Sequence, residues 1–202
     1  MSLLDGASLL LWVIFFPIPF FWLLVHPFAE FWRRRRGRTH AAFALTFWLA
    51  AACFFLGTWE FWFAARFPRS WLTNLLGAAL LAVEAIVIPQ AEGQLGVAIL
   101  IGRAELDPRQ FPPRLVDTGI YRHVRHPRYL SAISAIWGTA VLSGATRFLI
   151  LAVLSVPLFY WVTLVEEREL AERLGAPFRE YQKRVPRFIP RLWPRLWPRL
   201  RL

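Results

Sequence analysis

Long apolar segments alternate with short polar ones along most of this 202-residue chain. Three of them run from Ala7 to Val25, from Ala41 to Phe63 and from Trp71 to Pro89, and a longer one runs from Tyr129 to Val165. About 20 apolar residues in a helix cross the ~30 Å hydrocarbon core of a bilayer. Each of the first three segments therefore predicts one transmembrane helix.

Small and proline residues refine this pattern. Pro17 and Pro19 interrupt the first segment and predict a kinked helix. Ser143-Gly144-Ala145-Thr146 lies near the middle of the Tyr129–Val165 segment, which predicts two antiparallel helices joined by a tight turn. The sequence thus predicts an all-α, polytopic membrane protein with about five transmembrane helices and a C-terminal helical hairpin.

Two stretches do not fit a membrane span. Gln90 to Arg128 is a polar connector with several glycines and prolines, and its apolar patch Leu95 to Ile101 is too short to cross, so we expect an interfacial helix there. Pro190 to Leu200 repeats Pro-Arg-Leu-Trp, and proline at every fourth position excludes a regular helix. Arginine and tryptophan favour lipid head groups, so we expect a basic interfacial tail.

Composition supports lipid as the solvent. The chain is 57% hydrophobic and 16% aromatic, more apolar surface than a soluble domain of this length can bury. Its net charge of +11 comes from arginines that flank apolar spans, which indicates anionic membrane lipids as partners and not nucleic acid. The single Cys53 excludes a disulfide framework and a thiolate metal cluster.

Charge asymmetry predicts an orientation. Of the 24 lysines and arginines, 21 lie in alternate loops and the tail, and three lie in the remaining loops. The positive-inside rule then puts the N-terminus outside and the C-terminus in the cytoplasm. The polar connector is expected on the cytoplasmic side.

Candidate chemistry lies at the two ends of the predicted hairpin. The stretch from Gly119 to Tyr129 holds three arginines, two histidines and two tyrosines, and Glu166-Glu167 follows the apolar run. His123 and His126 lack the i, i+4 spacing and a nearby third ligand, so we predict no metal site. No glycine-rich dinucleotide motif is present. Cations, imidazoles, phenols and carboxylates together suit a zwitterionic ligand that carries a ribose.

These motifs resemble a known family. The chain contains Gly-x-Tyr-x-x-x-Arg-His-Pro-x-Tyr, then an apolar hairpin, then Glu-Glu and a downstream Tyr-Gln-Lys-Arg-Val-Pro. In this combination it resembles the isoprenylcysteine carboxyl methyltransferases and their prokaryotic relatives, and more distantly the phospholipid methyltransferases. The resemblance covers Arg114 to Pro186. It implies a membrane enzyme that uses S-adenosylmethionine to methylate a lipophilic or lipid-modified acceptor, either an isoprenylcysteine-type carboxylate or another lipid-like substrate.

The resemblance also implies roles for particular residues. It divides a single integral membrane domain, 1–202, into variable spans with a connector (1–113), a cofactor-binding core (114–186) and the basic tail (187–202). Arg125 and Glu167 are the candidate catalytic residues. The implied cofactor-binding residues are Leu115, Val116, Tyr121, His126, Pro127, Tyr129 and Glu166. One departure concerns the substrate, because Val162 stands where eukaryotic members have an arginine linked to it.

Two other functions remain open at this point. NADPH-dependent sterol-reductase-like membrane enzymes carry a similar Arg-His-Pro-x-Tyr segment, although adjacent Glu166 and Glu167 favour methyl transfer. A non-enzymatic lipid-binding membrane protein is the second alternative. In that case Arg122 and Arg128 are charge anchors, and the tyrosines are interface aromatics.

Overall fold

The computed structural model describes residues 2–35, 37–96, 110–112 and 114–190. Most of the expected interfacial helix and nearly all of the Pro-Arg-Leu-Trp repeat lie outside these residues. The described helices are α1 (Leu3–Phe15), α2 (Ile18–Val25), η1 (His26–Phe28), α3 (Ala29–Arg34), α4 (Gly37–Gly57), α5 (Trp59–Phe63), α6 (Trp71–Leu95), η2 (Gly119–Arg122), α9 (Pro127–Ser143), α10 (Thr146–Leu174) and α11 (Ala176–Arg184).

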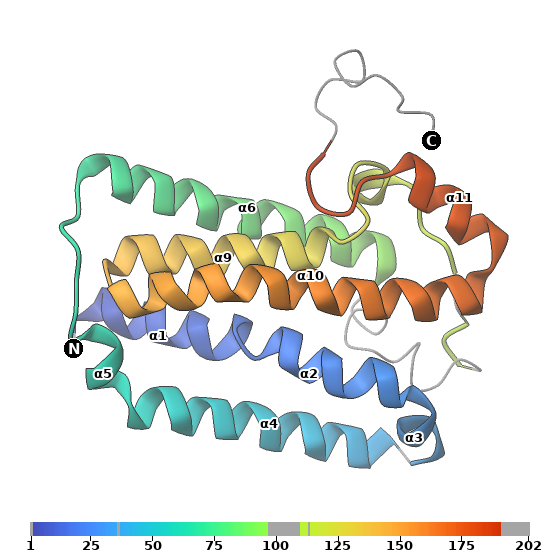
Figure 1. Cartoon of the computed structure of the whole chain (residues 1–202), viewed down its shortest axis with the longest axis horizontal. Coiled ribbons are helices and arrows are strands. Elements are labelled where there is room, and N and C mark those ends of the chain that lie inside the picture. Colours follow the sequence, from blue (N-terminus) through green and yellow to red (C-terminus); the bar gives the residue numbers. More distant parts are fainter. Residues whose placement is uncertain (1, 36, 97–109, 113, 191–202) are drawn as a thin grey trace.

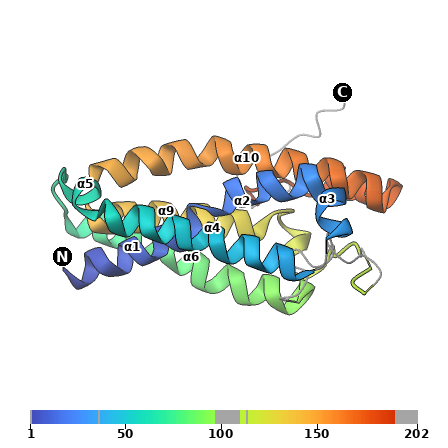
Figure 2. The same ribbon diagram turned by 90° about the horizontal axis from the view of Figure 1, so that it is seen from below.

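The long helices form an elongated bundle with roughly parallel axes (Figures 1 and 2). Within the part of the chain that the structure describes, four stretches are long and apolar enough to cross a membrane: Leu3–Val25, Thr39–Gly57, Trp71–Leu95 and Thr146–Leu174. The predicted all-α polytopic fold is confirmed. The expected fifth span is α9, which at 17 residues is shorter than these four.

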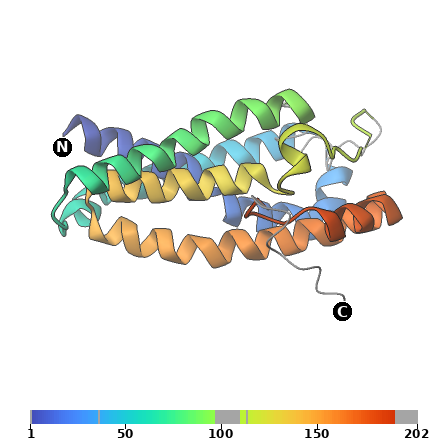
Figure 3. The same ribbon diagram turned by 90° about the horizontal axis from the view of Figure 1, so that it is seen from above.

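Helix α9 lies between α6 and α10 (Figures 1 and 3) and also packs on α1. Small residues make this central position possible. A Cβ at Gly138 would lie 2.9 Å from the carbonyl oxygen of Gly77, and a Cβ at Gly77 would lie 3.0 Å from that of Gly138. The backbones of α6 and α9 thus approach as closely as small residues allow, which is how helices often associate in membranes.

The predicted kink and hairpin are both confirmed. Helix α1 ends at Phe15 and α2 begins at Ile18, with Pro17 at the break. Gly144 has φ +68°, a left-handed conformation that glycine adopts without strain, and it ends α9 just before α10 begins. Because the turn reverses the chain, it brings the start of α9 near the far end of α10.

Aromatic rings fill much of the interior. The fully buried Trp12 of α1 stacks on Phe148 of α10 with ring centroids 4.5 Å apart, and Trp62 of α5 stacks on the same ring at 5.5 Å. The outward faces of the spans carry exposed apolar side chains such as Leu45, Leu75 and Val153. A surface of this kind suits contact with lipid.

Two basic segments lie at the same end of the bundle. The arginines of α3 and the basic residues of α11 lie at the end that also holds the connector (Figure 1). The opposite end holds the α5–α6 loop and the α9–α10 turn. Which end faces the cytoplasm stays a prediction from the charge pattern.

Candidate functional site

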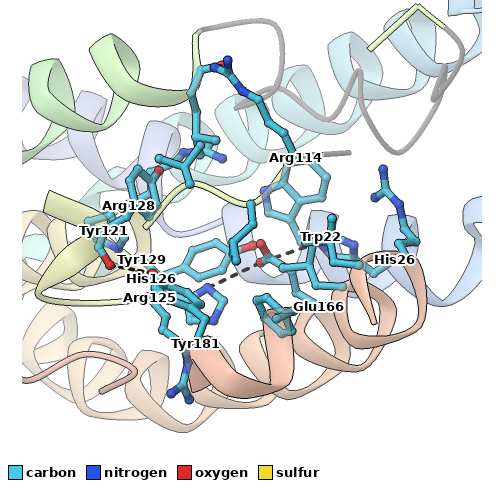
Figure 4. Close-up of a pocket in the computed structure, with 18 of the residues that line it drawn as sticks. Trp22, His26, Arg114, Tyr121, Arg125, His126, Arg128, Tyr129, Glu166 and Tyr181 are labelled. Atoms are coloured by element: carbon cyan, nitrogen blue, oxygen red, sulfur yellow. Dashed lines mark hydrogen bonds and ion pairs between the residues drawn. The ribbon is translucent and has the colours of Figure 1, made fainter. Parts of the chain in front are cut away.

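A pocket that is open to solvent lies at the connector end of the bundle; its space is about 970 Å³ when the open solvent at its mouth is included. Its walls come from η2 and the start of α9, from the last turns of α10, from α11, and from α2 with η1 (Figure 4). The reversal at Gly144 is what brings the sequence-distant walls together.

The C-terminal segment holds the connector in place through its backbone. The amides of Arg125 and His126 donate to the carbonyls of Pro186 and Arg187 at 2.9 and 3.1 Å. The hydroxyl of Tyr181 donates to the carbonyl of Tyr121 at 2.6 Å. The downstream half of the motif is therefore a structural support for the upstream half.

Burial raises the pKa of both Tyr121 and Tyr181 above the ordinary value of 10.0. Desolvation disfavours the phenolate, and the positive charge of Arg128 and Arg125, respectively, offsets this only in part. Both phenols are therefore neutral hydrogen-bond donors at physiological pH. Neither is poised to act as a base.

Glu167 is the centre of a buried network. Its carboxylate accepts from Nε of Arg125 at 2.9 Å, from Nε2 of His126 at 2.9 Å, from Arg187 at 3.0 and 2.7 Å, and from Gln182 at 3.0 Å. The hydrogen bond between Arg187 and Glu167 is the largest cause of the raised pKa of Arg187. Glu167 thereby ties α10 to the connector and to the segment after α11.

Glu166 points into the pocket instead (Figure 4). Its buried Oε2 has no hydrogen-bond partner among the described residues. It lies 3.8 Å from Nδ1 of His126 and 3.9 Å from Nε2 of His26, so one imidazole stands on each side of it. A buried carboxylate oxygen without a partner is costly in an apolar surrounding and is a ready acceptor for a ligand N–H or O–H.

His26 is fixed from the side opposite Glu166. Its Nδ1 lies 2.8 Å from Oε2 of Glu169, and Glu169 is itself paired with Arg33 at 3.1 Å and with Arg173 at 3.4 Å. The ring of Trp22 stacks on His26 with centroids 4.9 Å apart. These contacts attach the N-terminal helices to the end of α10.

Nearly all of the predicted site residues line this pocket. The lining includes Leu115, Val116, Tyr121, Arg125, His126, Pro127, Tyr129 and Glu166. Glu167 is not among the lining residues, and its contacts indicate that it positions its neighbours. The catalytic roles predicted for Arg125 and Glu167 and the cofactor contacts of the others stay predictions.

Sequence reasoning did not assign to the site any residue of the N-terminal helices, and it also left out three arginines and one tyrosine of the pocket lining. Trp22, His26, Arg114, Arg128, Arg173 and Tyr181 also line the pocket. His26 follows directly on the first apolar segment, and nothing in its spacing connects it with a glutamate 143 positions later. The only available signal was a histidine at the end of a span that the charge pattern places on the connector side.

The lining permits binding of a zwitterionic, partly aromatic ligand. Trp22, Tyr121 and Phe178 offer flat or apolar surface, Arg114 and Arg128 offer positive charge, and Glu166 offers an acceptor. Within the described residues, no group of three or more His, Cys, Asp or Glu side chains is arranged to hold a metal ion.

Comparisons with known proteins agree with this chemistry. A family model described as phospholipid methyltransferase matches residues 72–176, from α6 to the start of α11. Phosphatidylethanolamine N-methyltransferase of Paracoccidioides brasiliensis (strain Pb03) is 26% identical over 160 residues, which are 74% of this chain and 15% of that protein. Methanethiol S-methyltransferase 1 of Bradyrhizobium diazoefficiens is 39% identical over 78 residues, 39% of this chain and 27% of that protein.

The chain thus spans only about 15% of the length of the fungal relatives. No solved structure gives a significant match. The region shared with the family contains the connector and both glutamates but not the helices before residue 72.

Proposed function

The chain belongs to the phospholipid methyltransferase family, and from that premise we propose that it transfers a methyl group from S-adenosylmethionine to a lipophilic acceptor at the membrane surface. The observation that carries the proposal is the pocket oxygen of Glu166. It is buried, has no hydrogen-bond partner among the described residues, and is flanked by His126 and His26.

The residues around the pocket fit such a cofactor. The carboxylate of Glu166 is suited to an ammonium or a ribose hydroxyl, and a pocket arginine is suited to a carboxylate. Tyr121 and Tyr129 provide aromatic surface beside the connector segment Leu115–Val116. Because the sequence has no glycine-rich dinucleotide motif, the connector itself would have to hold the nucleoside of the cofactor.

When bound, the cofactor supplies a methyl group on a sulfonium whose leaving thioether is neutral. No general acid is therefore needed for the departure. What the protein contributes is alignment of the acceptor with the methyl carbon, and alignment of two reactants accounts for a large share of the rate in such reactions. The network around Glu167 keeps the connector rigid enough for that alignment.

Exposed apolar faces on the spans would let a lipophilic acceptor approach from the bilayer. The names of the relatives refer to phosphatidylethanolamine and to methanethiol, and these are the first acceptor types to test. The isoprenylcysteine carboxylate suggested by the motif is the third. Val162 lacks the charge that would recognise that carboxylate.

Calorimetry on the purified full chain tests the cofactor. We expect S-adenosylhomocysteine to bind and NADPH not to bind. Glu166→Gln should weaken binding roughly 10- to 100-fold, because a charge-assisted hydrogen bond contributes about 1.5–3 kcal/mol. Glu172→Gln, an exposed carboxylate on the same helix, is the matched control and should bind normally.

Binding of NADPH alone would identify a reductase-type site and overturn the proposal. Equal affinity in the wild type and Glu166→Gln would remove Glu166 from the cofactor site. Lipid extracts incubated with the protein and with cofactor labelled in its methyl group would then reveal the acceptor class.

A further inference from the structure

Among the described residues, four arginines line the pocket, and three of them are already engaged by the protein. Arg125 is paired with Glu167 at 2.9 Å, and Arg173 is paired with Glu169 at 3.4 Å. Arg114 is exposed and donates to a backbone carbonyl at the end of α6 at 2.9 Å. The charge of these three side chains is therefore either neutralised within the protein or screened by water.

The fourth arginine is Arg128, in the first turn of α9. It is half-buried, and its guanidinium makes no hydrogen bond or ion pair within the part of the chain that the structure describes. Glu84 of α6 is close enough to interact with this charge but does not form an ion pair with it. A partly desolvated cation without a partner is a ready site for an anionic group of a ligand.

The phenol of Tyr121 lies near two opposite charges of the pocket wall. Burial is the main cause of its raised pKa; the positive charge of Arg128 opposes the rise, and the negative charge of Glu166 adds to it. The hydroxyl makes no hydrogen bond to any residue that the structure describes. A cation and a neutral donor from the connector side thus share the pocket with an acceptor from α10 (Figure 4).

An α-amino acid group satisfies these three side chains at once. Its carboxylate accepts from a guanidinium and from a phenol, and its ammonium donates to a carboxylate. The buried Oε2 of Glu166, which has no hydrogen-bond partner among the described residues, is suited to that ammonium. A phosphate would be attracted by Arg128 but repelled by Glu166, and a neutral nucleoside would use neither charge. The lining therefore favours the amino-acid end of a ligand.

We propose that Arg128 recognises the carboxylate of the methyl donor, with Tyr121 donating to the same carboxylate and Glu166 accepting from the ammonium beside it. This rests on the cofactor proposed above and adds a residue that determines which ligands the site selects. Arg128 occupies the variable position of Arg-His-Pro-x-Tyr, so the motif itself does not specify it. The site then selects the methyl donor by its amino-acid part as well as by its nucleoside.

Calorimetry on the full chain in detergent tests this with three ligands. S-adenosylhomocysteine carries both charged groups, its decarboxylated analogue keeps only the ammonium, and 5′-methylthioadenosine lacks the amino-acid part. We expect the wild type to bind S-adenosylhomocysteine about 10- to 100-fold more tightly than the decarboxylated analogue. Arg128→Gln should lower the affinity for S-adenosylhomocysteine by that factor, whereas the affinities for the other two ligands should not fall.

Three other variants separate recognition of the carboxylate from a general effect of charge or folding. Arg128→Lys, a smaller change in case Arg128→Gln does not fold, keeps the charge but not the forked geometry, so it should reduce the preference without abolishing it. Glu166→Gln should weaken both ligands that carry the ammonium and leave 5′-methylthioadenosine unaffected. Arg122→Gln, an exposed arginine on η2 outside the pocket lining, is the matched control and should bind all three ligands as the wild type does.

A wild type that binds S-adenosylhomocysteine and its decarboxylated analogue equally well overturns the proposal without any variant. An Arg128 variant that keeps the full wild-type preference, or that weakens all three ligands alike, overturns it too. Failure of the wild type to bind S-adenosylhomocysteine at all is a different result, because it overturns the proposed function itself.

Discussion

The network around Glu167 yields the most direct prediction about stability. Its carboxylate accepts five hydrogen bonds, four of them from Arg125, Arg187 and His126. The side chains are largely buried, at 6% exposure for Glu167, 10% for Arg125 and 18% for Arg187. Glu167→Gln keeps the shape but leaves two guanidinium groups without a counter-charge.

Removing one partner of a buried ion pair costs about 3–5 kcal/mol, because the remaining charge stays desolvated. In a chain of this length we expect the melting temperature in detergent to fall by about 10 °C. The connector is held by the same network, so S-adenosylhomocysteine affinity should fall as well. Thermal unfolding monitored by circular dichroism and calorimetry measure the two effects.

Glu180→Gln is the control, since Glu180 is an exposed carboxylate on α11 that pairs only with Lys183 among the described residues. It should melt at the wild-type temperature. If Glu167→Gln also melts within about 2 °C of the wild type and binds as tightly, the network does not stabilise the connector and the reasoning is wrong.

Two further predictions concern packing and pH. Gly138→Ala should destabilise the protein by about 1–3 kcal/mol in chemical or thermal unfolding, because the new Cβ would lie 2.9 Å from the carbonyl oxygen of Gly77. Gly93→Ala is the control and should not destabilise the protein, because the space around its Cβ is open. Burial raises the pKa of Tyr121 and Tyr181, so the stability from their neutral phenols is fully present below about pH 10 and lost as pH rises through the higher folded pKa. Ultraviolet titration should accordingly show a late-ionising component of at least two tyrosines, and a titration without such a component would contradict this.

Much of the architecture was predictable because lipid imposes simple rules on a chain. Apolar length, Pro17 and Gly144 were sufficient for the kinked first helix, the next two spans and the hairpin. The motifs in the connector and the paired glutamates likewise indicated eight of the residues that line the pocket. The boundaries were less predictable: α6 continues through Pro89 to Leu95, because a proline does not end a helix whose neighbours support it.

The sequence by itself determined that this chain is a helical membrane protein with a cluster of polar chemistry at both ends of one hairpin, since hydropathy and local motifs depend only on neighbouring residues. Only the tertiary structure decided how the two adjacent glutamates differ. Successive residues on a helix point about 100° apart, so Glu167 meets Arg125 and Arg187 while Glu166 faces the pocket. His26 entered the site for the same reason: packing of the N-terminal helices against α10 places it beside Glu169, and no spacing along the chain encodes that contact.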